Sequence, residues 1–218
     1  MIVIATNNGI NFLPNLLSDL EKFNITEEIS IIDTQSSDSE FINYLDNLKS
    51  FNKFNLNINV YQTPYRGFDT GAYIYAIQNL KSDRFIFLQD SIRIKNIDFF
   101  NLTEKKLKTS NVVTVLTFDG NFWDNQIQKD FSLKHFGTTT FDKGIFGPMF
   151  SISYLDSQKL NNLIYPIDKN QQMAMERCWS IIFKKQNFTI DSIDGSHNDF
   201  KIQNDGYTYF SKIKPNRI

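Results

Sequence analysis

The chain of 218 residues contains a single cysteine, Cys178, and only two histidines, two tryptophans and five prolines. One cysteine cannot form an intrachain disulfide or a cysteine-rich zinc site, so a small disulfide-stabilised secreted scaffold is excluded. Cys178 falls on the apolar face of an expected helix, and the sequence around it does not have the basic character that favours a reactive thiolate. We expect it to pack as a small hydrophobic residue with no chemical role.

An excess of charge and long apolar runs are also missing. Lys and Arg number 23 and Asp and Glu number 24, a formal net charge of −1, so there is no basic field to hold a nucleic-acid backbone. The longest tight apolar run, 85–88, is far shorter than the roughly 18 residues of a membrane-spanning helix. Residues 1–5 lack the basic region of a signal peptide and are typical of a β-strand. We therefore expect a cytoplasmic protein with no transmembrane segment and no nucleic-acid partner.

Three common active-site signatures do not occur in the sequence. The G-x-G-x-x-G fingerprint and the P-loop are missing, which disfavours dinucleotide dehydrogenases and P-loop enzymes. The G-x-S-x-G elbow of α/β-hydrolases is missing as well.

The first hundred residues alternate between β-rich apolar runs and segments with helical periodicity. Strands are predicted over 2–6, 29–32, 56–61 and 84–88, and apolar residues recur at helical spacing over 10–23, 41–48 and 72–80. Such alternation with short polar connections predicts right-handed βαβ units and a mostly parallel sheet. Because 84–88 is apolar on both faces, helices are expected to cover both sides of the sheet.

The second half shows weaker patterning. Strands are predicted over 112–118, 147–154 and 188–193, a short helix over 156–163 and a longer one over 171–185. Segment 120–141 is polar and aromatic with few periodic signals. Its aromatic residues, expected mainly in the core and alternatively stacked on sugar rings, are Phe122, Trp123, Phe131, Phe136 and Phe141. With no repeat or linker, the chain is predicted to be a single α/β domain, 1–218.

Polar side chains gather where the predicted strands end. Thr6, Asn7 and Asn8 follow the first strand, and Asp33, Arg66 and Asp90 follow the next three. Ligands of open parallel sheets bind beyond the carboxyl ends of the strands. A carboxylate accepts hydrogen bonds from a base or ribose, and a guanidinium can bind a phosphate. Each residue alone is better explained as a turn or helix-cap residue, but that explanation is weaker for the whole set, which suits a nucleotide site.

Four sequence blocks carry a resemblance to a known family. The blocks 2–8, 31–38, 66–73 and 85–91 resemble, in order and approximate spacing, successive motifs of nucleotide-sugar-dependent glycosyltransferases with the GT-A fold. Block 66–73, Arg-Gly-Phe-Asp-Thr-Gly-Ala-Tyr, is also similar to a segment of polysaccharide-synthesis glycosyltransferases. The resemblance implies a GT-A-like sheet in which 1–100 binds the nucleotide sugar and 101–218 faces the acceptor.

The resemblance also assigns roles to residues of the first half. It places the nucleobase on Asp33, the donor on Arg66, and a divalent cation that neutralises the donor diphosphate on the catalytic Asp90. The donor-binding residues that it implies are Thr6, Asn7, Asn8, Asp33, Arg66, Gly67, Asp69, Gln89, Asp90 and Ser91.

The metal motif of the family is altered in this chain. Gln89-Asp90-Ser91 stands where the family has D-x-D, so both outer aspartates are replaced. Mn²⁺ or Mg²⁺ remains the expected cofactor, because one carboxylate with donor phosphates and water can hold a hard cation. By resemblance, His197 completes the metal shell. The alternative is that His197 is an ordinary loop histidine.

Glu176 is the expected general base on the acceptor side. It is the only carboxylate in 173–179, where inverting relatives carry an acidic pair. The alternative is a solvated helical glutamate paired with Arg177 or a lysine. Other candidates for the base are Asp119, Asp124 and Asp142, and segment 144–152 resembles the glycine-containing strand that borders the acceptor pocket.

The resemblance therefore predicts transfer of a sugar from a UDP- or GDP-sugar to a carbohydrate hydroxyl. A sugar-phosphate nucleotidyltransferase is one alternative, although 7–10 lacks the glycine-rich loop with Arg and Lys that such an enzyme needs. A nucleotide-sugar or glycan-binding module without turnover is the other alternative.

Overall fold

The computed structural model describes residues 1–64, 66–119, 122–194, 196–197 and 207–213, with only the backbone of Asp119, Ser196 and His197. Its centre is a seven-stranded sheet in the order β10-β6-β9-β4-β1-β2-β3. The strands are β1 (Ile2–Thr6), β2 (Ile29–Asp33), β3 (Ile58–Gln62), β4 (Arg84–Gln89), β6 (Val112–Thr114), β9 (Phe150–Ser153) and β10 (Ile190–Ser192). Only β9 runs antiparallel to its neighbours β4 and β6, so the expected mostly parallel sheet is confirmed.

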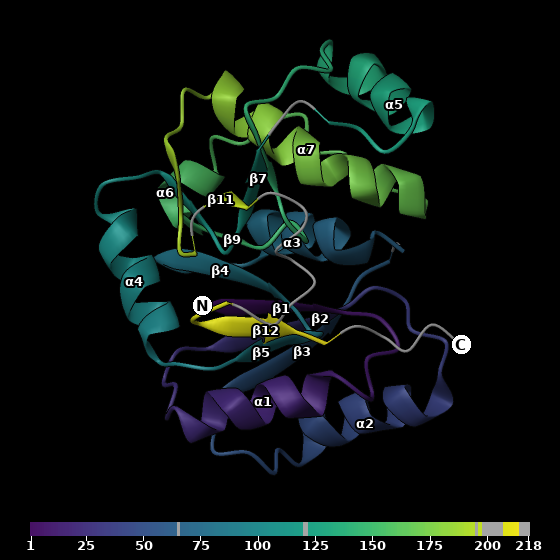
Figure 1. Ribbon diagram of the computed structural model, residues 1–218. Coiled ribbons are helices and arrows are strands. Elements are labelled where there is room, and N and C mark those ends of the chain that lie inside the picture. Colours follow the sequence, from purple (N-terminus) through teal and green to yellow (C-terminus); the bar gives the residue numbers. More distant parts are fainter. Residues whose placement is uncertain (65, 120–121, 195, 198–206, 214–218) are drawn as a thin grey trace.

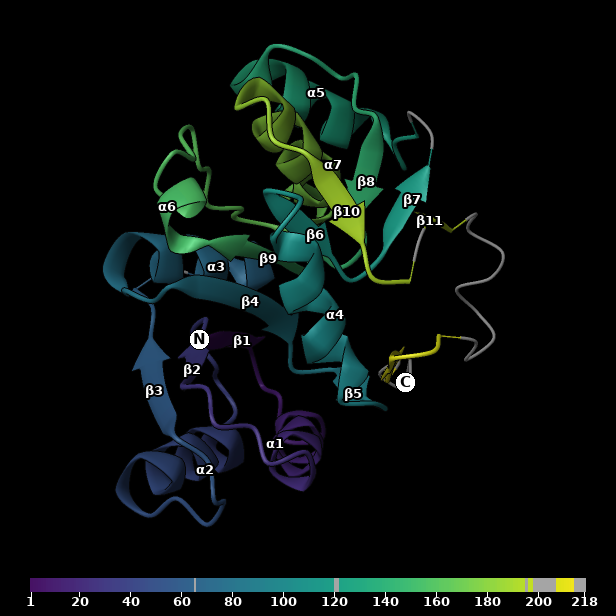
Figure 2. The ribbon, with the colours of Figure 1, turned by 90° about the vertical axis from the view of Figure 1, so that its left-hand side faces the viewer.

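Helices cover both faces of this sheet (Figures 1 and 2). The helices are α1 (Leu13–Lys22), α2 (Ser39–Ser50), α3 (Phe68–Asn79), α4 (Asp98–Leu107), α5 (Gln126–Phe136), α6 (Tyr154–Ser157) and α7 (Lys169–Lys185). Side chains of α1, α2 and α4 form the core on one face. Those of α3 and α7 form the core on the other face, and α5 packs on α7.

Alternate residues of the central strands enter these two cores. In β1, Ile2 and Ile4 point to the core of α1 and α2, whereas Val3 and Ala5 point to the core of α3 and α7. All four side chains are at most 1% exposed. This explains why the inner strands have no polar face, as parallel strands covered on both sides require.

The predicted strand over 112–118 is wrong as a single element. It is divided into β6 and β7 (Thr117–Asp119), and β7 lies in a second sheet with β8 (Lys143–Ile145) and β11 (Ser196–His197). Between them, the Val115 N–H donates to the Met149 carbonyl (3.1 Å), and the Phe146 N–H donates to Leu116 (3.1 Å). The turn between β8 and β9 therefore separates the two strands.

Two helices were missed, and a third was misplaced. In α5, Ile127 and Leu133 are more than half exposed, whereas Gln128 and Ser132 are fully buried, so the apolar periodicity that would mark a helix is missing. The α4 segment was not predicted either. The helix expected over 156–163 is a single turn, α6, which starts earlier because the Ser153 hydroxyl accepts a hydrogen bond from the Asp156 N–H.

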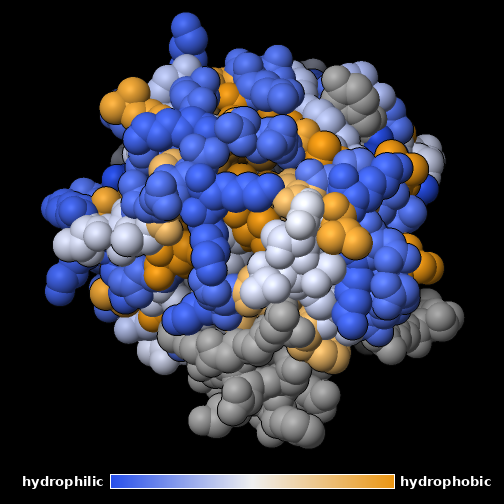
Figure 3. All heavy atoms as spheres, turned by 90° about the horizontal axis from the view of Figure 1, so that it is seen from above, coloured by the Kyte–Doolittle hydropathy of each residue, from blue (hydrophilic) through white to orange (hydrophobic). Residues whose placement is uncertain are grey.

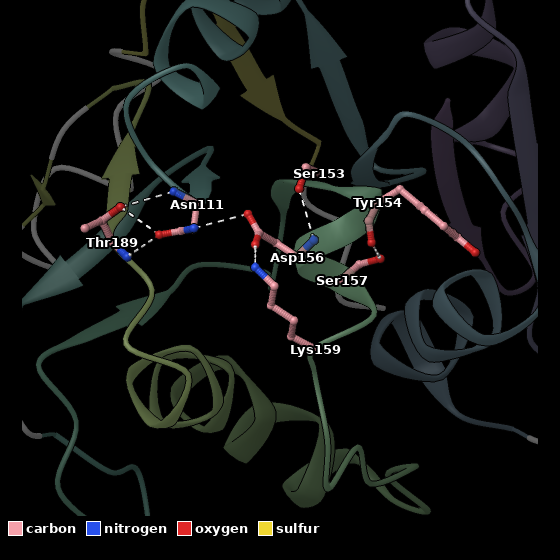
Figure 4. A network of polar contacts seen from close by, with 7 residues as sticks. All are labelled: Asn111, Ser153, Tyr154, Asp156, Ser157, Lys159 and Thr189. Carbon is pink, nitrogen blue, oxygen red and sulfur yellow. Dashed lines mark hydrogen bonds and ion pairs between the residues drawn. The ribbon is translucent and has the colours of Figure 1, made fainter.

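A polar network holds α6 against the sheet (Figure 4). Asp156 accepts hydrogen bonds from Lys159 (2.6 Å) and from the Asn111 amide (3.1 Å). Asn111 also accepts from the backbone and hydroxyl of Thr189, both at 3.1 Å. The network thus joins α6 to the residues that precede β6 and β10, at the end of the sheet opposite the polar residues described below.

The aromatic residues of the loop-rich segment lie mostly in the core, as expected. Trp123, Phe131, Phe136 and Phe141 are 3–7% exposed, whereas Phe122 is 52% exposed. Burial raises the pKa of the Cys178 thiol to about 12, which agrees with its expected packing role.

The face that carries α5 and α7 is mainly hydrophilic, with separate small hydrophobic patches (Figure 3). On α5, the apolar side chains of Ile127 and Leu133 are exposed. Within the described ranges, no helix combines the length and apolar character needed to cross a membrane.

An ion pair fixes the strand that follows β4. β5 (Ile92–Ile94) pairs with β12 (Phe210–Lys212) in an antiparallel ribbon. Arg93 on β5 donates two hydrogen bonds of 2.6 Å to the Asp19 carboxylate on α1, which also accepts from the Ile94 N–H (3.1 Å). Because the Asp19 side chain is only 10% exposed, this bidentate pair should contribute more than a surface ion pair.

We expect Asp19→Ala to lower the free energy of unfolding by about 2 kcal/mol, because it leaves the Arg93 guanidinium and a buried N–H without their acceptor. Asp46→Ala is the control, since the Asp46–Lys49 pair is exposed and is expected to contribute less than about 0.5 kcal/mol. Urea unfolding followed by circular dichroism measures both. Equal losses in the two variants would contradict the assignment.

Candidate functional site

Asp90 and Thr6 meet at the carboxyl ends of two adjacent strands. Thr6 ends β1, Asp90 follows β4, and the Thr6 hydroxyl donates to Oδ2 of Asp90 at 2.6 Å. The backbone of Gly9 lies against this pair, because a β-carbon at Gly9 would overlap both side chains. The glycine allows this close approach, a role that no sequence motif indicates.

Asp69 links this pair to helix α7. Oδ2 of Asp69, in the first turn of α3, accepts a hydrogen bond from the Gln89 amide and another from the Gln172 amide (3.4 Å). Gln172 lies one turn before Glu176 on α7, so both side chains lie on the same face of that helix.

A chain of neighbouring polar groups therefore crosses the site. Thr6 is hydrogen-bonded to Asp90, whose neighbour in sequence, Gln89, is hydrogen-bonded to Asp69. Asp69 also accepts a hydrogen bond from Gln172, and Glu176 lies one helical turn after Gln172. The structure thus brings Asp90, Asp69 and Glu176 into one region, although they are 21 to 107 residues apart in sequence. Such convergence at the carboxyl edge is where an open α/β sheet binds its ligands.

Asp33 lies on the other side of β1, in register with Thr6. Its carboxylate accepts hydrogen bonds from the Ser36 hydroxyl (2.5 Å) and Ser36 N–H (3.1 Å), and Gln62 lies at 3.4 Å. The residue is 2% exposed. Asp33 and Gln62 line a small cavity of about 90 Å³ between α2 and β3. Its present hydrogen bonds are those of a turn aspartate, and its expected role toward a nucleobase stays a prediction.

The two asparagines after β1 bind the neighbouring loop. Asn7 donates to the Thr34 carbonyl (2.8 Å), and Asn8 Oδ1 accepts from the N–H groups of Ser37 and Asp38, both at 2.9 Å. These contacts hold the β1 and β2 loops together. In the described contacts, both asparagines have structural roles, whereas their donor-binding role is untested.

Three further expected donor residues flank the start of α3 and the end of β4. Arg66 is exposed, with its guanidinium 5.7 Å from the Phe68 ring, and no described bond connects it to Asp33 or Asp90. Gly67 caps α3, and a β-carbon there would lie 2.5 Å from the Gly71 Cα. Ser91 donates its N–H to the Asp90 carboxylate.

The carboxyl groups of Asp90, which follows β4, and of Asp69 on α3 have raised pKa values. Burial raises the pKa of Asp90 to about 7, and the nearby charge of Asp69 adds to the rise. The hydrogen bond from Thr6 opposes it. Burial also raises the pKa of Asp69, and the positive charge of Lys212 and the hydrogen bond from Gln89 oppose that shift. Perturbed carboxyl groups of this kind are typical of functional sites.

Glu176 has a similar environment. Burial raises its pKa to about 7, although the Arg177 guanidinium, 3.6 Å away, favours its ionised form. Its side chain is 24% exposed, so solvent or a ligand can reach it. Arg177 is itself buried and also binds Asp124 at 3.2 Å. The alternative of a solvated glutamate paired with Arg177 holds only in part. Glu176 contacts Arg177, but it is not freely solvated.

The three other candidates for the base differ from Glu176. Asp142 is 66% exposed and pairs with Lys184. Asp124 is held in the ion pair with Arg177. The side chain of Asp119 lies outside the described residues. Of these carboxyl groups, Glu176 alone is joined through its helix to the polar chain.

The described residues do not fit a divalent cation. In the part of the chain that the structure describes, no group of three or more His, Cys, Asp or Glu side chains could hold a metal. Asp90 Oδ2 already accepts the Thr6 hydrogen bond, and the replaced outer aspartates leave neutral Gln89 and Ser91 beside it. The expected ligand His197 is described only by its backbone in β11.

Sequence reasoning missed Gly9, Gln172 and Lys212. No motif marked Gln172, because glutamine on a helix is ordinary. Lys212 lies 122 residues after Asp90 and reaches the site only because β12 pairs with β5. Only a prediction of the pairing between β5 and β12 could have identified Lys212 from the sequence.

The raised pKa values predict how stability changes with pH. Unfolded Asp and Glu have pKa values near 4, so between about pH 4 and pH 7 the folded protein binds more protons at Asp90 and Glu176 than the unfolded chain does. Their contribution to the free energy of unfolding therefore falls as the pH rises through this window. We expect Asp90→Asn and Glu176→Gln to raise the melting temperature at about pH 8, with a smaller gain at about pH 5. Differential scanning fluorimetry measures this.

Asp83→Asn is the matched control for that measurement, because Asp83 is exposed and should show no such pH-dependent gain. A destabilisation by Asp90→Asn that is equal at both pH values would contradict the assignment of a buried, proton-binding carboxyl group.

Solved structures of other proteins have a similar fold, although sequence comparisons find no match. No family model and no curated protein sequence matches the chain. Among solved structures, S. aureus TarS 1–349 in complex with UDP-GlcNAc matches 98% of this chain and 58% of that chain, with a TM-score of 0.56 and 14% identity. GalNAc-T7 with UDP, GalNAc and Mn²⁺ matches 88% of this chain and 41% of that chain, with a TM-score of 0.57 and 16% identity.

These likenesses extend over nearly the whole chain, which spans less than two thirds of the length of either solved chain. At 14–16% identity they concern the fold, and they agree with the sheet and helix arrangement described above. The chain has the GT-A glycosyltransferase fold that the sequence resemblance implied.

Proposed function

We propose that this protein transfers a sugar from a nucleoside diphosphate sugar, a UDP- or GDP-sugar, to a carbohydrate hydroxyl. The observation that carries the proposal is the chain of polar groups from Thr6 and Asp90 through Asp69 to Glu176 at the carboxyl edge of a GT-A sheet. The solved structures of S. aureus TarS 1–349 with UDP and with UDP-GlcNAc, which have a similar fold, support the donor class.

The donor lies, in this proposal, across the ends of β4, β1 and β2. Asp33 and its small cavity are at the β2 end of this edge, and Asp90 and Asp69 are at the β4 end. Neighbouring strands are about 4.8 Å apart, so the two ends are roughly 10 Å apart, which suits a nucleoside at one end and a diphosphate at the other. The Mn²⁺ or Mg²⁺ implied by the resemblance is left out of this proposal, because the described residues do not supply its ligands.

Glu176 acts as the general base in an inverting transfer. The acceptor O–H bond breaks and its proton passes to the Glu176 carboxylate, while the acceptor oxygen forms a bond to the anomeric carbon. The bond from that carbon to the diphosphate breaks, and its electron pair remains on the diphosphate oxygen. A base with a pKa of about 7 is suited to this step, because general bases work best near the operating pH.

Binding of nucleotides tests the donor class. We expect UDP or GDP, and the corresponding sugar nucleotide, to bind with saturation in isothermal titration calorimetry. Asp90→Ala should weaken that binding through loss of the Thr6–Asp90 contact at the β4 end. No binding of any of UDP, GDP, CDP or TDP at millimolar concentration would overturn the proposal. Saturable binding without transfer to any glycan acceptor would instead favour the non-catalytic module.

The base is tested by the pH dependence of the rate. We expect kcat/KM to rise with pH up to about 7 and then level off, because Glu176 must be ionised to accept the proton. Glu176→Gln should remove this rising limb and lower kcat at least ~100-fold. Asp142→Asn, which changes an exposed carboxylate, should keep the wild-type profile. The rising limb persisting in Glu176→Gln would show that another group is the base.

A further inference from the structure

A ribbon of two short strands brings Lys212 to the end of β4. β12 pairs with β5 so that Lys212 is opposite Ile92, and the Ile213 N–H donates to the Ser91 carbonyl at 2.8 Å. The backbone of Lys212 is therefore fixed beside the residues that directly follow Asp90. The Asp19–Arg93 ion pair anchors β5 on α1 and so holds the ribbon in place.

The Lys212 side chain extends toward the turn between β8 and β9. Its ammonium is 5.0 Å from the centre of the Phe146 ring. It is also 3.3 Å from the point where a β-carbon on Gly147 would be, and Gln89 Oε1 is 2.9 Å from that same point. Gly147 has φ +57°, a backbone conformation that favours glycine. The ammonium and Gln89 Oε1 thus flank one small space.

The groups around this space are unsatisfied within the described residues. Gln89 Oε1 is buried and has no hydrogen-bond partner there. Lys212 forms no ion pair with any described residue, although Asp69, Asp90 and Glu176 are all close enough to be affected by its charge. A buried acceptor without a partner calls for an explanation, and a bound ligand that carries hydroxyl groups provides one.

We propose that the Lys212 ammonium binds the diphosphate of the donor and supplies there the positive charge that a divalent cation supplies in metal-dependent enzymes. The inference rests on the proposed function. It follows from the position of the ammonium near Gln89 Oε1, where its charge also acts on Asp90. It follows further from Gln89-Asp90-Ser91, in which both outer aspartates of the cation motif are replaced, and from the lack, among the described residues, of a group of three His, Cys, Asp or Glu side chains that could hold a cation. As the bond to the anomeric carbon breaks, the leaving diphosphate gains negative charge, and a fixed ammonium stabilises that charge.

Phosphate-dependent binding tests this role. Isothermal titration calorimetry with UDP, UMP and uridine, and in parallel with GDP, GMP and guanosine, is carried out in EDTA and then in Mn²⁺. The wild type should bind the diphosphate in EDTA. Lys212→Gln should bind the diphosphate about 10-fold or more weakly, because one charge-assisted contact is lost, and should bind the nucleoside as the wild type does. Lys212→Arg should restore most of the affinity.

Lys129→Gln on the exposed face of α5 is the matched control and should bind like the wild type. Melting temperature and circular dichroism verify that each Lys212 variant is folded, and Lys212→Arg keeps the test valid if the glutamine variant is not. Diphosphate binding that requires Mn²⁺ in the wild type, or that is unchanged in Lys212→Gln, would overturn the inference while leaving the proposed function intact. Failure of the wild type to bind any nucleotide, with or without Mn²⁺, would instead overturn the proposed function and this inference with it.

Discussion

The hydrogen bonds that Gln89 and Gln172 donate to one oxygen of Asp69 hold the site together. Gln89 belongs to the sheet, Asp69 to the first turn of α3, and Gln172 to α7. A carboxylate that accepts two amide hydrogens fixes three elements relative to one another. The expected donor side, which includes Asp90, and the expected acceptor side, which includes Glu176, therefore have a defined separation, and transfer between two bound sugars depends on such a separation.

The site concentrates acidic groups where water is scarce. Burial raises the pKa of Asp69, Asp90 and Glu176, so at neutral pH part of the folding free energy is lost in keeping these groups ionised. A nearby ammonium offsets some of that cost. The positive charge of Lys212 has this effect on all three carboxyl groups.

Several polar residues of the family-like blocks already have structural partners within this chain. Asp33 stands at the family position expected to hold the nucleobase, yet its carboxylate accepts two hydrogen bonds from Ser36. Asn7 and Asn8 likewise bind the neighbouring loop. Polar residues at the ends of strands must satisfy their own turns before they can bind a ligand, so their functional roles depend on what those turns leave available.

The sequence alone determined the parallel half of the sheet, because over 1–90 the strands buried on both faces leave short continuous apolar runs and the helices between them leave periodic signals. The family resemblance placed Asp69, Gln89 and Asp90 among the expected donor-binding residues, and the structure brings these three close together. The sequence did not reveal α5, whose buried positions include Gln128 and Ser132, nor the division of 112–118 between two sheets. Only the tertiary structure brought Gln172 to Asp69, and Lys212 to the strand that follows Asp90, because contacts between residues so far apart depend on strand pairing and helix packing, which have no local signature in the sequence.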